Sequence, residues 1–418
     1  MENTAINNNI PIAPEYIKRF EQMGLGMFVH FGLYSQLSRG EWVMQCHKMS
    51  KESYTPLKET FRPAGMGEIV RTAKEAGCKY VCLTTRHHDG FSLYDTKGLS
   101  DYDAPHSPAK RDLVAEFVEE CREANIVPFF YHTTLDWHHP DFKADFNRYL
   151  EYLRQSVELL CTNYGKIGGF WFDGNWSRRD ADWKEDELYS MIRRLQPEAM
   201  IINNTGTSRR GALGNEYIDS VTYERGMPTP IDRRGMKRYV AGEMCETLND
   251  HWGVADDLNY KPVKRLIEEI CACRKVGANM LLNVGPNGDG SLPLMAKAIM
   301  EAIGRWMSIY GRAIYNGRPY IAEDGKKDFV LRDAADEKTF YLFKHDLGVG
   351  GDSNVTLETC GNRVAVLSGF EGEIERVRWM DDGKDLDFSF ENGKLSVACT
   401  DFIYGQNLCV RVAEIKTK

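Results

Sequence analysis

Short apolar runs alternate with amphipathic helical patterns over the first 316 residues or so of the chain. The apolar runs are mostly continuous, as expected for parallel strands that are covered on both faces. Helical spacing is clearest in "DLVAEFVEECREAN", where the apolar residues recur on one face. Eight runs are predicted to be strands, within 27–32, 80–90, 126–137, 167–174, 199–205, 217–224, 239–246 and 278–286. Eight strand–helix units predict a (β/α)8 barrel.

The predicted barrel is irregular, and it does not account for the whole chain. The segments between the fifth, sixth and seventh runs are too short or too rich in proline and glycine to form good helices. After residue 318 the pattern changes to strands and turns, most clearly in "LDFSFENGKLSVACT", where two alternating runs flank Asn392-Gly393. We therefore predict an α/β barrel domain over residues 1–318, which would carry the chemistry, and a C-terminal antiparallel β-sandwich over residues 319–418.

Polar side chains close the predicted strands. Because the active sites of (β/α)8 enzymes lie at the C-terminal ends of the strands, these side chains are expected to meet. A single residue of this kind more often caps the following helix, but eight strands that all end this way favour a shared polar pocket. The residues, in strand order, are His30; His87 and His88; Tyr131 and His132; Asp173; Asn203 and Asn204; Glu224; Glu243 and Glu246; and Asn283.

Composition excludes some classes of partner. The 418 residues carry a formal charge of −8 with a pI near 5.8, which argues against nucleic acid or an anionic membrane surface as a partner. We expect no secretory signal at the start of the sequence and no apolar stretch long enough to span a bilayer. The eleven cysteines mostly sit in apolar runs, so reduced thiols in the cytoplasm are expected rather than disulfides or zinc ligands.

Aromatic residues cluster near the same strand ends and suggest a ligand class. They are Trp42, Trp137, Trp171, Trp176 and Trp252. The apolar faces of a sugar stack on flat aromatic walls, whereas its hydroxyl groups bond to acids, amides and imidazoles. No glycine-rich phosphate loop is present in the sequence. This mixture favours a carbohydrate over a phosphorylated ligand.

Paired acids complete the candidate chemistry. Glycoside hydrolysis needs one carboxylate as nucleophile or base and a second carboxyl group that is kept protonated as the acid. Asp173 ends the apolar run "GGFWFDG" and can therefore be held rigidly. Glu224 and Glu243 are the candidates for the second role.

Four segments closely resemble the family 29 glycoside hydrolases, the α-L-fucosidases. They are "MFVHFGLYSQLSRGEWV", "YVCLTTRHHDGFSLYDT", "WFDG" and "GANMLLNVGPNGDGSLP", and the resemblance runs from about residue 15 to 320. The stretches "HHDGF" and "NMLLNVGPNGDG" are the specific ones. The resemblance implies a retaining exo-hydrolase of terminal α-L-fucose with an irregular (β/α)8 barrel and a C-terminal β-sandwich.

The resemblance also implies roles for individual residues. Asp173 would be the nucleophile that forms a fucosyl-enzyme intermediate. The imidazoles and Glu41 would bond the fucose hydroxyl groups, and the aromatic residues would cover its methyl group and apolar face. The expected fucose contacts are His30, Glu41, Trp42, His87, His88, Tyr131 and Trp252. The expected partner is a fucosylated oligosaccharide or glycoconjugate, with no cofactor and no metal; a homo-oligomer is compatible with the sequence.

Two departures from the family pattern affect the site. Many relatives carry an arginine after the fifth strand, where this chain has Thr205, so one polar contact is missing or is supplied from elsewhere. The acid/base often lies in a "TPE"-like element, which reads "VTYE" here and indicates Glu224. A "WE" element of relatives matches "GE", so Glu243 remains the alternative acid/base. We favour Glu224, because a general acid must reach the glycosidic oxygen from above the sixth strand.

Two other functions remain open at this stage. One is a metal-dependent hydrolase that uses His87, His88, His138 and His139. Adjacent histidines within a strand would point to opposite faces and would rarely reach one ion, which counts against it. The other is a non-catalytic sugar-binding protein, against which the several candidate acids count. The sequence does not indicate the fucosyl linkage, the oligomeric state or transfucosylation activity.

Overall fold

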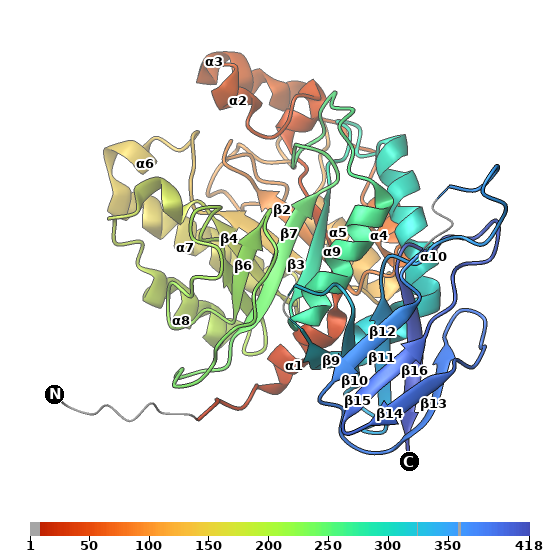
Figure 1. The fold of residues 1–418 in the computed structure, drawn as a ribbon. Coiled ribbons are helices and arrows are strands. Elements are labelled where there is room, and N and C mark those ends of the chain that lie inside the picture. The colour runs from red at the N-terminus through yellow and green to blue at the C-terminus, as the bar shows by residue number, and fades with distance from the viewer. Residues whose placement is uncertain (1–8, 324, 358–360) are drawn as a thin grey trace. The chain divides into compact units, whose positions relative to one another are not determined.

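Eight parallel strands close into a barrel in sequential order, from β1 next to β2 around to β8 next to β1 (Figure 1). The computed structural model describes residues 9–323, 325–357 and 361–418. The barrel strands are β1 (Leu25–Val29), β2 (Tyr80–Arg86), β3 (Val127–Thr133), β4 (Gly169–Asp173), β5 (Met200–Asn203), β6 (Ser220–Glu224), β7 (Ala241–Thr247) and β8 (Asn279–Val284). The predicted (β/α)8 barrel is confirmed.

Helices follow most of the barrel strands along the chain. Asp112 caps the N-terminus of α5 by accepting a hydrogen bond from the backbone N–H of Ala115 at 2.9 Å, and Asn125 ends that helix in the left-handed conformation. The α-helices are α1 (Glu15–Met23), α2 (Val43–Cys46), α3 (Lys51–Tyr54), α4 (Gly67–Glu75), α5 (Leu113–Ala124), α6 (Asp141–Ala144), α7 (Phe146–Asn163), α8 (Glu185–Leu195), α9 (Val263–Lys275) and α10 (Leu294–Asn316). The short 3-10 helices are η1 (Leu33–Leu37), η2 (Thr55–Thr60) and η3 (Asn175–Arg178).

The barrel is irregular where the sequence predicts it to be. Residues 204–219 between β5 and β6, and residues 225–240 between β6 and β7, are all described and contain no helix. Across the described ranges, no helix is both long enough and apolar enough to cross a bilayer.

Alternation along β4 explains how an apolar strand delivers a carboxylate. Trp171 belongs to the cluster of side chains inside the barrel. Phe170 and Phe172 stack on each other at 5.5 Å on the opposite face, where Phe172 contacts Tyr189 of α8. Successive side chains of a strand point to opposite faces, so Asp173 shares the inner side with Trp171.

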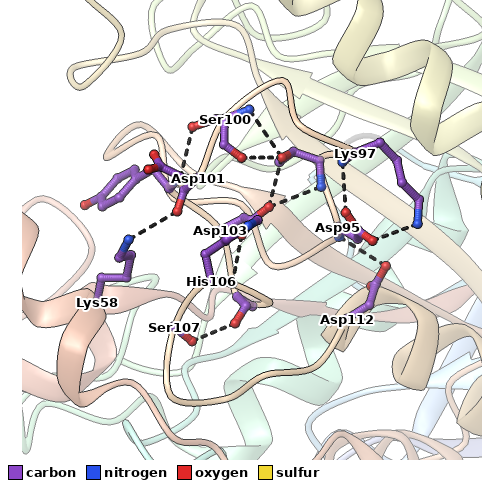
Figure 2. Close-up of polar contacts among 12 residues, drawn as sticks. Lys58, Asp95, Lys97, Ser100, Asp101, Asp103, His106, Ser107 and Asp112 are labelled. Carbon is purple, nitrogen blue, oxygen red and sulfur yellow. Dashed lines mark hydrogen bonds and ion pairs between the residues drawn. The ribbon is translucent and has the colours of Figure 1, made fainter.

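The long segment between β2 and α5 is held by side chains instead of regular structure (Figure 2). Asp103 is fully buried, and its carboxylate accepts hydrogen bonds from the Thr96 hydroxyl at 2.9 Å and from the His106 ring at 2.6 Å. Asp112 accepts a hydrogen bond from the backbone N–H of Asp95, and the Lys58 ammonium donates to the Asp101 carbonyl (Figure 2). These contacts fix the segment that begins with residues 87 and 88.

The C-terminal strands form two antiparallel sheets around one apolar core. The five-stranded sheet has the order β13-β16-β11-β10-β9, and the three-stranded sheet has the order β12-β15-β14. Their bounds are β9 (Gly317–Ala322), β10 (Phe329–Asp333), β11 (Thr339–Lys344), β12 (Val364–Ser368), β13 (Ile374–Trp379), β14 (Phe388–Glu391), β15 (Lys394–Ala398) and β16 (Arg411–Thr417). The predicted sandwich is confirmed, as is the hairpin at Asn392-Gly393, where both residues have positive φ.

Internal contacts divide the chain into two compact units. One contains residues 1–260 and 279–301, and the other contains residues 261–278 and 302–418. The predicted domain boundary at residue 318 stays a prediction. All eight barrel strands belong to the first unit.

A buried carboxylate at the start of β6 ties several segments together. Asp219 is fully buried and accepts hydrogen bonds from Arg193 at 2.5 Å, Arg238 at 2.6 Å, the Tyr16 hydroxyl at 2.9 Å and the backbone N–H of Ile201 at 2.9 Å. It therefore links α1, α8, β5 and the segment before β7.

We predict that Asp219→Ala lowers the free energy of unfolding by about 3 kcal/mol, the lower end for breaking a buried ion pair, because both arginines remain partly exposed. Urea denaturation followed by circular dichroism measures the change. Asp232→Ala is the matched control, because Asp232 pairs with Arg234 on the surface. Equal denaturation midpoints for the two variants would contradict the assigned role of Asp219.

Candidate active site

A cavity of about 260 Å³ is lined by residues at the C-terminal ends of strands β1 to β6, by residues in the loops after β1, β2, β4 and β5, and by Trp252 in the loop after β7. It contains eight of the predicted site residues: Asp173, Glu224, His30, Trp42, His87, His88, Tyr131 and Trp252. The remaining lining residues are Phe28, Trp171, Trp176, Arg179, Asn204, Thr205, Gly206, Thr207, Ser208. Seven of the twelve polar strand-end residues in the sequence therefore meet in one place.

Asp173 lies at the centre of a converging set of donors. Its Oδ1 accepts hydrogen bonds from the Trp176 indole at 2.8 Å and the Asn204 amide at 3.1 Å. Its Oδ2 accepts one from the Tyr131 hydroxyl at 3.1 Å and lies 3.4 Å from Nε2 of His88. The side chain is 13% exposed, so one side of the carboxylate remains open to the cavity.

These donors keep the Asp173 carboxylate ionised. Burial alone would raise the pKa of Asp173, but hydrogen bonding and charge from His88 act in the opposite direction. The hydrogen bonds from Trp176 and Asn204 add to that effect, and the pKa lies below its ordinary value. An aspartate that is both ionised and partly desolvated is suited to act as a nucleophile.

Gly174 allows the chain to turn back directly after this carboxylate. Its φ is +119°, and a Cβ at this position would lie 2.5 Å from the backbone nitrogen of Leu135. Because of this turn, the indole of Trp176, three residues after Asp173, reaches back to the Asp173 carboxylate.

Glu224 and Asp173 share one amide nitrogen. Nδ2 of Asn204 donates to Oδ1 of Asp173 at 3.1 Å and to Oε2 of Glu224 at 2.8 Å. These two oxygens can therefore be no farther apart than the sum of the two lengths, about 5.9 Å. Retaining glycosidases hold their carboxyl groups about 5–5.5 Å apart, whereas inverting enzymes hold them about 6.5–9.5 Å apart. The spacing fits the retaining class.

The two carboxyl groups are electrostatically distinct. Burial raises the pKa of Glu224, and the negative charge of Asp173 raises it further. The Asn204 amide, Arg225 and Arg210 oppose this rise without reversing it. One carboxyl group is thus held ionised while its neighbour favours the protonated form, which is the separation that acid–base roles require.

The histidines present fixed rings to the cavity. Nδ1 of His30 lies 2.7 Å from Oδ1 of Asn283, and burial lowers the pKa of His30 to about 3, so its ring is neutral. Burial also lowers the pKa of His87 well below the ordinary value. The Thr133 hydroxyl donates its hydrogen to the carbonyl of Leu135 and thus accepts from Nδ1 of His88 at 2.7 Å. This leaves Nε2 of His88 facing Asp173.

The strand-alternation argument against a shared histidine site is wrong here. β2 ends at Arg86, so His87 and His88 lie beyond the strand, and both line the cavity with ring centroids 4.2 Å apart. Within the described ranges no three His, Cys, Asp or Glu side chains form a group that could hold a metal ion. His138 stacks on Tyr102 at 3.9 Å and does not line the cavity.

Glu41 supports the cavity wall from behind. Its side chain is buried and does not line the cavity; its Oε2 accepts the backbone N–H groups of Trp252 and Gly253 at 3.1 and 2.8 Å. It thereby fixes the position of Trp252, whose ring lies 5.1 Å from that of His30. Trp42, the residue after Glu41, stacks against Trp176 with ring centroids 5.9 Å apart.

Glu243 lies deeper in the barrel and does not line the cavity. In the register of β6 and β7, Glu243 pairs with Thr222, and Glu224 pairs with Cys245. Glu243 is therefore two residues, or roughly 7 Å, nearer the strand starts than Glu224. Its carboxyl group accepts hydrogen bonds from the Trp171 indole, at 2.8 Å, and from the Tyr80 hydroxyl.

Four other strand-end residues also do not line the cavity. His132 bonds to the Thr85 hydroxyl at 2.9 Å, and Asn203 donates to the Tyr189 hydroxyl at 2.7 Å. The other two are Glu246, which accepts a hydrogen bond from the backbone N–H of Thr247, and Asn283. Of these four, His132 and Asn203 each neighbour a cavity residue in sequence, so strand-end position alone does not separate the residues that line the cavity from those that do not.

Sequence reasoning missed Arg179, and it gave Asn204 no role in the site. Arg179 follows η3 and lines the cavity, where its guanidinium donates to the Ser208 hydroxyl at 3.2 Å. It brings a cation to the cavity, which Thr205 also lines. Arg179 does not lie at the end of a predicted strand, so no pattern in the sequence indicates it. Asn204 does lie at a strand end and could have been predicted to enter the site.

Comparisons with known proteins agree with this geometry. A model of the Alpha-L-fucosidase family matches residues 8–312. The tissue α-L-fucosidase of Rattus norvegicus is 26% identical over 400 residues, covering 87% of this chain and 83% of the rat protein. The structure of α-L-fucosidase isoenzyme 1 from Paenibacillus thiaminolyticus is 30% identical, with a TM-score of 0.80, and covers 97% of this chain and 99% of that chain.

The fold also matches a GH29 α-L-fucosidase from Bacteroides thetaiotaomicron, solved as a trapped covalent intermediate with 2-fluoro-fucosyl fluoride. Its TM-score is 0.81 at 24% identity, and the match covers 99% of this chain and 98% of that chain.

We predict that Glu243→Gln flattens the pH dependence of stability. Burial raises the pKa of Glu243 to about 7, so the folded state holds a proton that the unfolded state releases near pH 4.5. Wild-type stability should therefore fall by up to roughly 1.4 kcal/mol per pH unit between about pH 5 and 7, and the variant should lack this contribution. Urea denaturation across this range measures it.

Glu158→Gln, on the surface of α7, is the matched control and should follow the wild type. Parallel curves for Glu243→Gln and the wild type would contradict the prediction.

Proposed function

Because this chain belongs to the α-L-fucosidase family of glycoside hydrolases, we propose that it is a retaining exo-α-L-fucosidase that acts by double displacement. The observation that carries the mechanism is the single Asn204 nitrogen bonded to both Asp173 and Glu224. It limits the distance between the two carboxyl groups to the range in which one attacks carbon and the other serves the departing oxygen. A covalent intermediate has been trapped in the Bacteroides protein whose fold this chain shares.

In the first step, Oδ2 or Oδ1 of Asp173 attacks the anomeric carbon of fucose. The bond between that carbon and the glycosidic oxygen breaks, and Glu224 gives its proton to the oxygen. The raised pKa of Glu224 favours the form that carries this proton, and the lowered pKa of Asp173 favours the attacking carboxylate. The products are a β-linked fucosyl ester and the free leaving group.

In the second step, the Glu224 carboxylate accepts a proton from water, and the resulting oxygen nucleophile attacks the same anomeric carbon. The ester bond to Asp173 breaks, and fucose leaves with its original α configuration. Loss of the negative charge on Asp173 in the ester removes one of the causes that raise the pKa of Glu224. The same residue can therefore serve as an acid in the first step and as a base in the second.

The rest of the cavity suits fucose. Neutral His30 uses its Nδ1–H to donate to Asn283, so its Nε2 can accept a hydrogen bond from a sugar hydroxyl group. Neutral His87 has one N–H and one lone pair for the same purpose. Trp42 and Trp252 provide flat apolar surfaces for the methyl group and the ring face. The family implies a fucosylated glycan as the substrate. A cytoplasmic location remains a prediction; the described cysteines are free thiols, most of them buried.

Nucleophile replacement tests the proposal. We predict that Asp173→Gly reduces turnover of 4-nitrophenyl α-L-fucoside at least about a thousandfold, because the first bond to carbon cannot form. Added azide should restore turnover by occupying the space of the lost carboxylate, and the product should be the inverted β-fucosyl azide. Product configuration is read by nuclear magnetic resonance.

The acid/base assignment is tested with the same substrate. Glu224→Ala should spare this activated aryl fucoside far more than a natural glycan, because nitrophenolate leaves without protonation, and azide should give the retained α product. Glu243→Gln is the control and should not show this pattern. Inverted product from Glu224→Ala, or the acid/base pattern in Glu243→Gln, would contradict the assignment.

A further inference from the structure

A second cavity adjoins the catalytic one. It has a volume of about 610 Å³ and is lined by parts of the segment 175–187 after β4 and of the segment 203–218, which begins at the end of β5. The two cavities share Trp176, Arg179, Asn204 and Thr205 as lining residues. The two cavities therefore adjoin each other at these four residues.

The position of Glu224, the proposed acid, determines which part of the substrate lies beside the residues that the two cavities share. The glycosidic oxygen must come within about 2.6–3.2 Å of the Glu224 carboxyl group to receive its proton. Oε2 of that carboxyl group lies 2.8 Å from the amide nitrogen of Asn204. Because Asn204 lines both cavities, the bond to be cleaved lies beside the boundary between them, and the leaving group departs at that boundary.

The lining of the second cavity suits uncharged sugars. Most lining side chains are polar, and charges of both signs are interspersed, so no field of one sign dominates. Lys184 pairs with Asp182 at 2.7 Å, which neutralises two of these charges. Trp176 and Trp183 add aromatic surface to the lining. The volume of the second cavity falls in the usual range for ligand sites, about 300–1,000 Å³.

We propose that the second cavity binds the leaving group of a neutral fucosylated oligosaccharide, with at least two sugar residues beyond the fucose. This inference rests on the proposed fucosidase function and adds the substrate class. Fucose occupies the catalytic cavity, and the remaining sugars contact Arg209, Leu213 and Asn215 in the second. An aryl fucoside would not reach these residues.

Kinetics on two substrates test the proposal. Arg209→Ala and Asn215→Ala each remove side chains that line the second cavity alone, and Leu213→Trp fills part of it. For a fucosylated trisaccharide, each change should raise KM about three- to tenfold, as for the loss of one hydrogen bond. For 4-nitrophenyl α-L-fucoside, kcat and KM should stay within about twofold of the wild type. The nitrophenyl leaving group does not reach the second cavity, so the substitutions there remove none of its binding energy.

Arg234→Ala and Leu258→Trp are the matched controls. Both side chains are exposed and line neither cavity, so neither substrate should be affected. Equal effects of the cavity variants on both substrates, or no effect on the trisaccharide, would overturn the inference. Wild-type cleavage of the aryl fucoside with no cleavage of trisaccharides over a panel of linkages would also overturn it. Absence of all α-L-fucoside turnover would instead contradict the proposed function.

Discussion

The amide nitrogen of Asn204 holds together the carboxyl groups of Asp173 and Glu224, the proposed nucleophile and acid/base. It donates to Asp173 and Glu224 at once, and no cation from a lysine or arginine side chain lies between them among the contacts described. An amide can bring two acids together without neutralising either, whereas a bridging arginine would favour ionisation of both. This contact depends on β4, β5 and β6 ending side by side, so the barrel closure is the structural condition for the chemistry.

The electrostatics of the cavity follow from that arrangement. Asp173 receives donors from four directions, which keep its charge in place despite burial, and this charge in turn raises the pKa of Glu224. Burial holds His30 and His87 neutral, so these two rings supply hydrogen-bonding groups without adding charges that would stabilise an ionised Glu224. Behind this layer, Glu41 and Glu243 hold the tryptophan walls by accepting their backbone or indole N–H groups. Asp173 and Glu224 are thus the acids proposed to react, whereas Glu41 and Glu243 hold the tryptophan residues in position.

The sequence predicted the barrel because each parallel strand is buried on both faces and reads as an apolar run. It predicted most of the site because barrel strands deliver their last inward side chains to one pocket. It favoured Glu224 but left Glu243 as the alternative, since the difference in depth between them depends on the register of β6 against β7, which pairs Glu243 with Thr222. It did not indicate Arg179 or the second cavity, which depend on how two irregular loops fold against each other. Register and loop geometry are tertiary properties that leave no local pattern.

The most direct test of this account is to identify the residue that becomes covalently bonded to the sugar. The wild-type enzyme, incubated with 2-fluoro-fucosyl fluoride and digested with a protease, should yield one fucosylated peptide by mass spectrometry. Fragmentation should locate the sugar on Asp173, since this carboxylate is the ionised member of the Asn204-bridged pair. A sugar located on Glu224 or Glu243, or an enzyme that turns over fucosides but is never labelled, would contradict it.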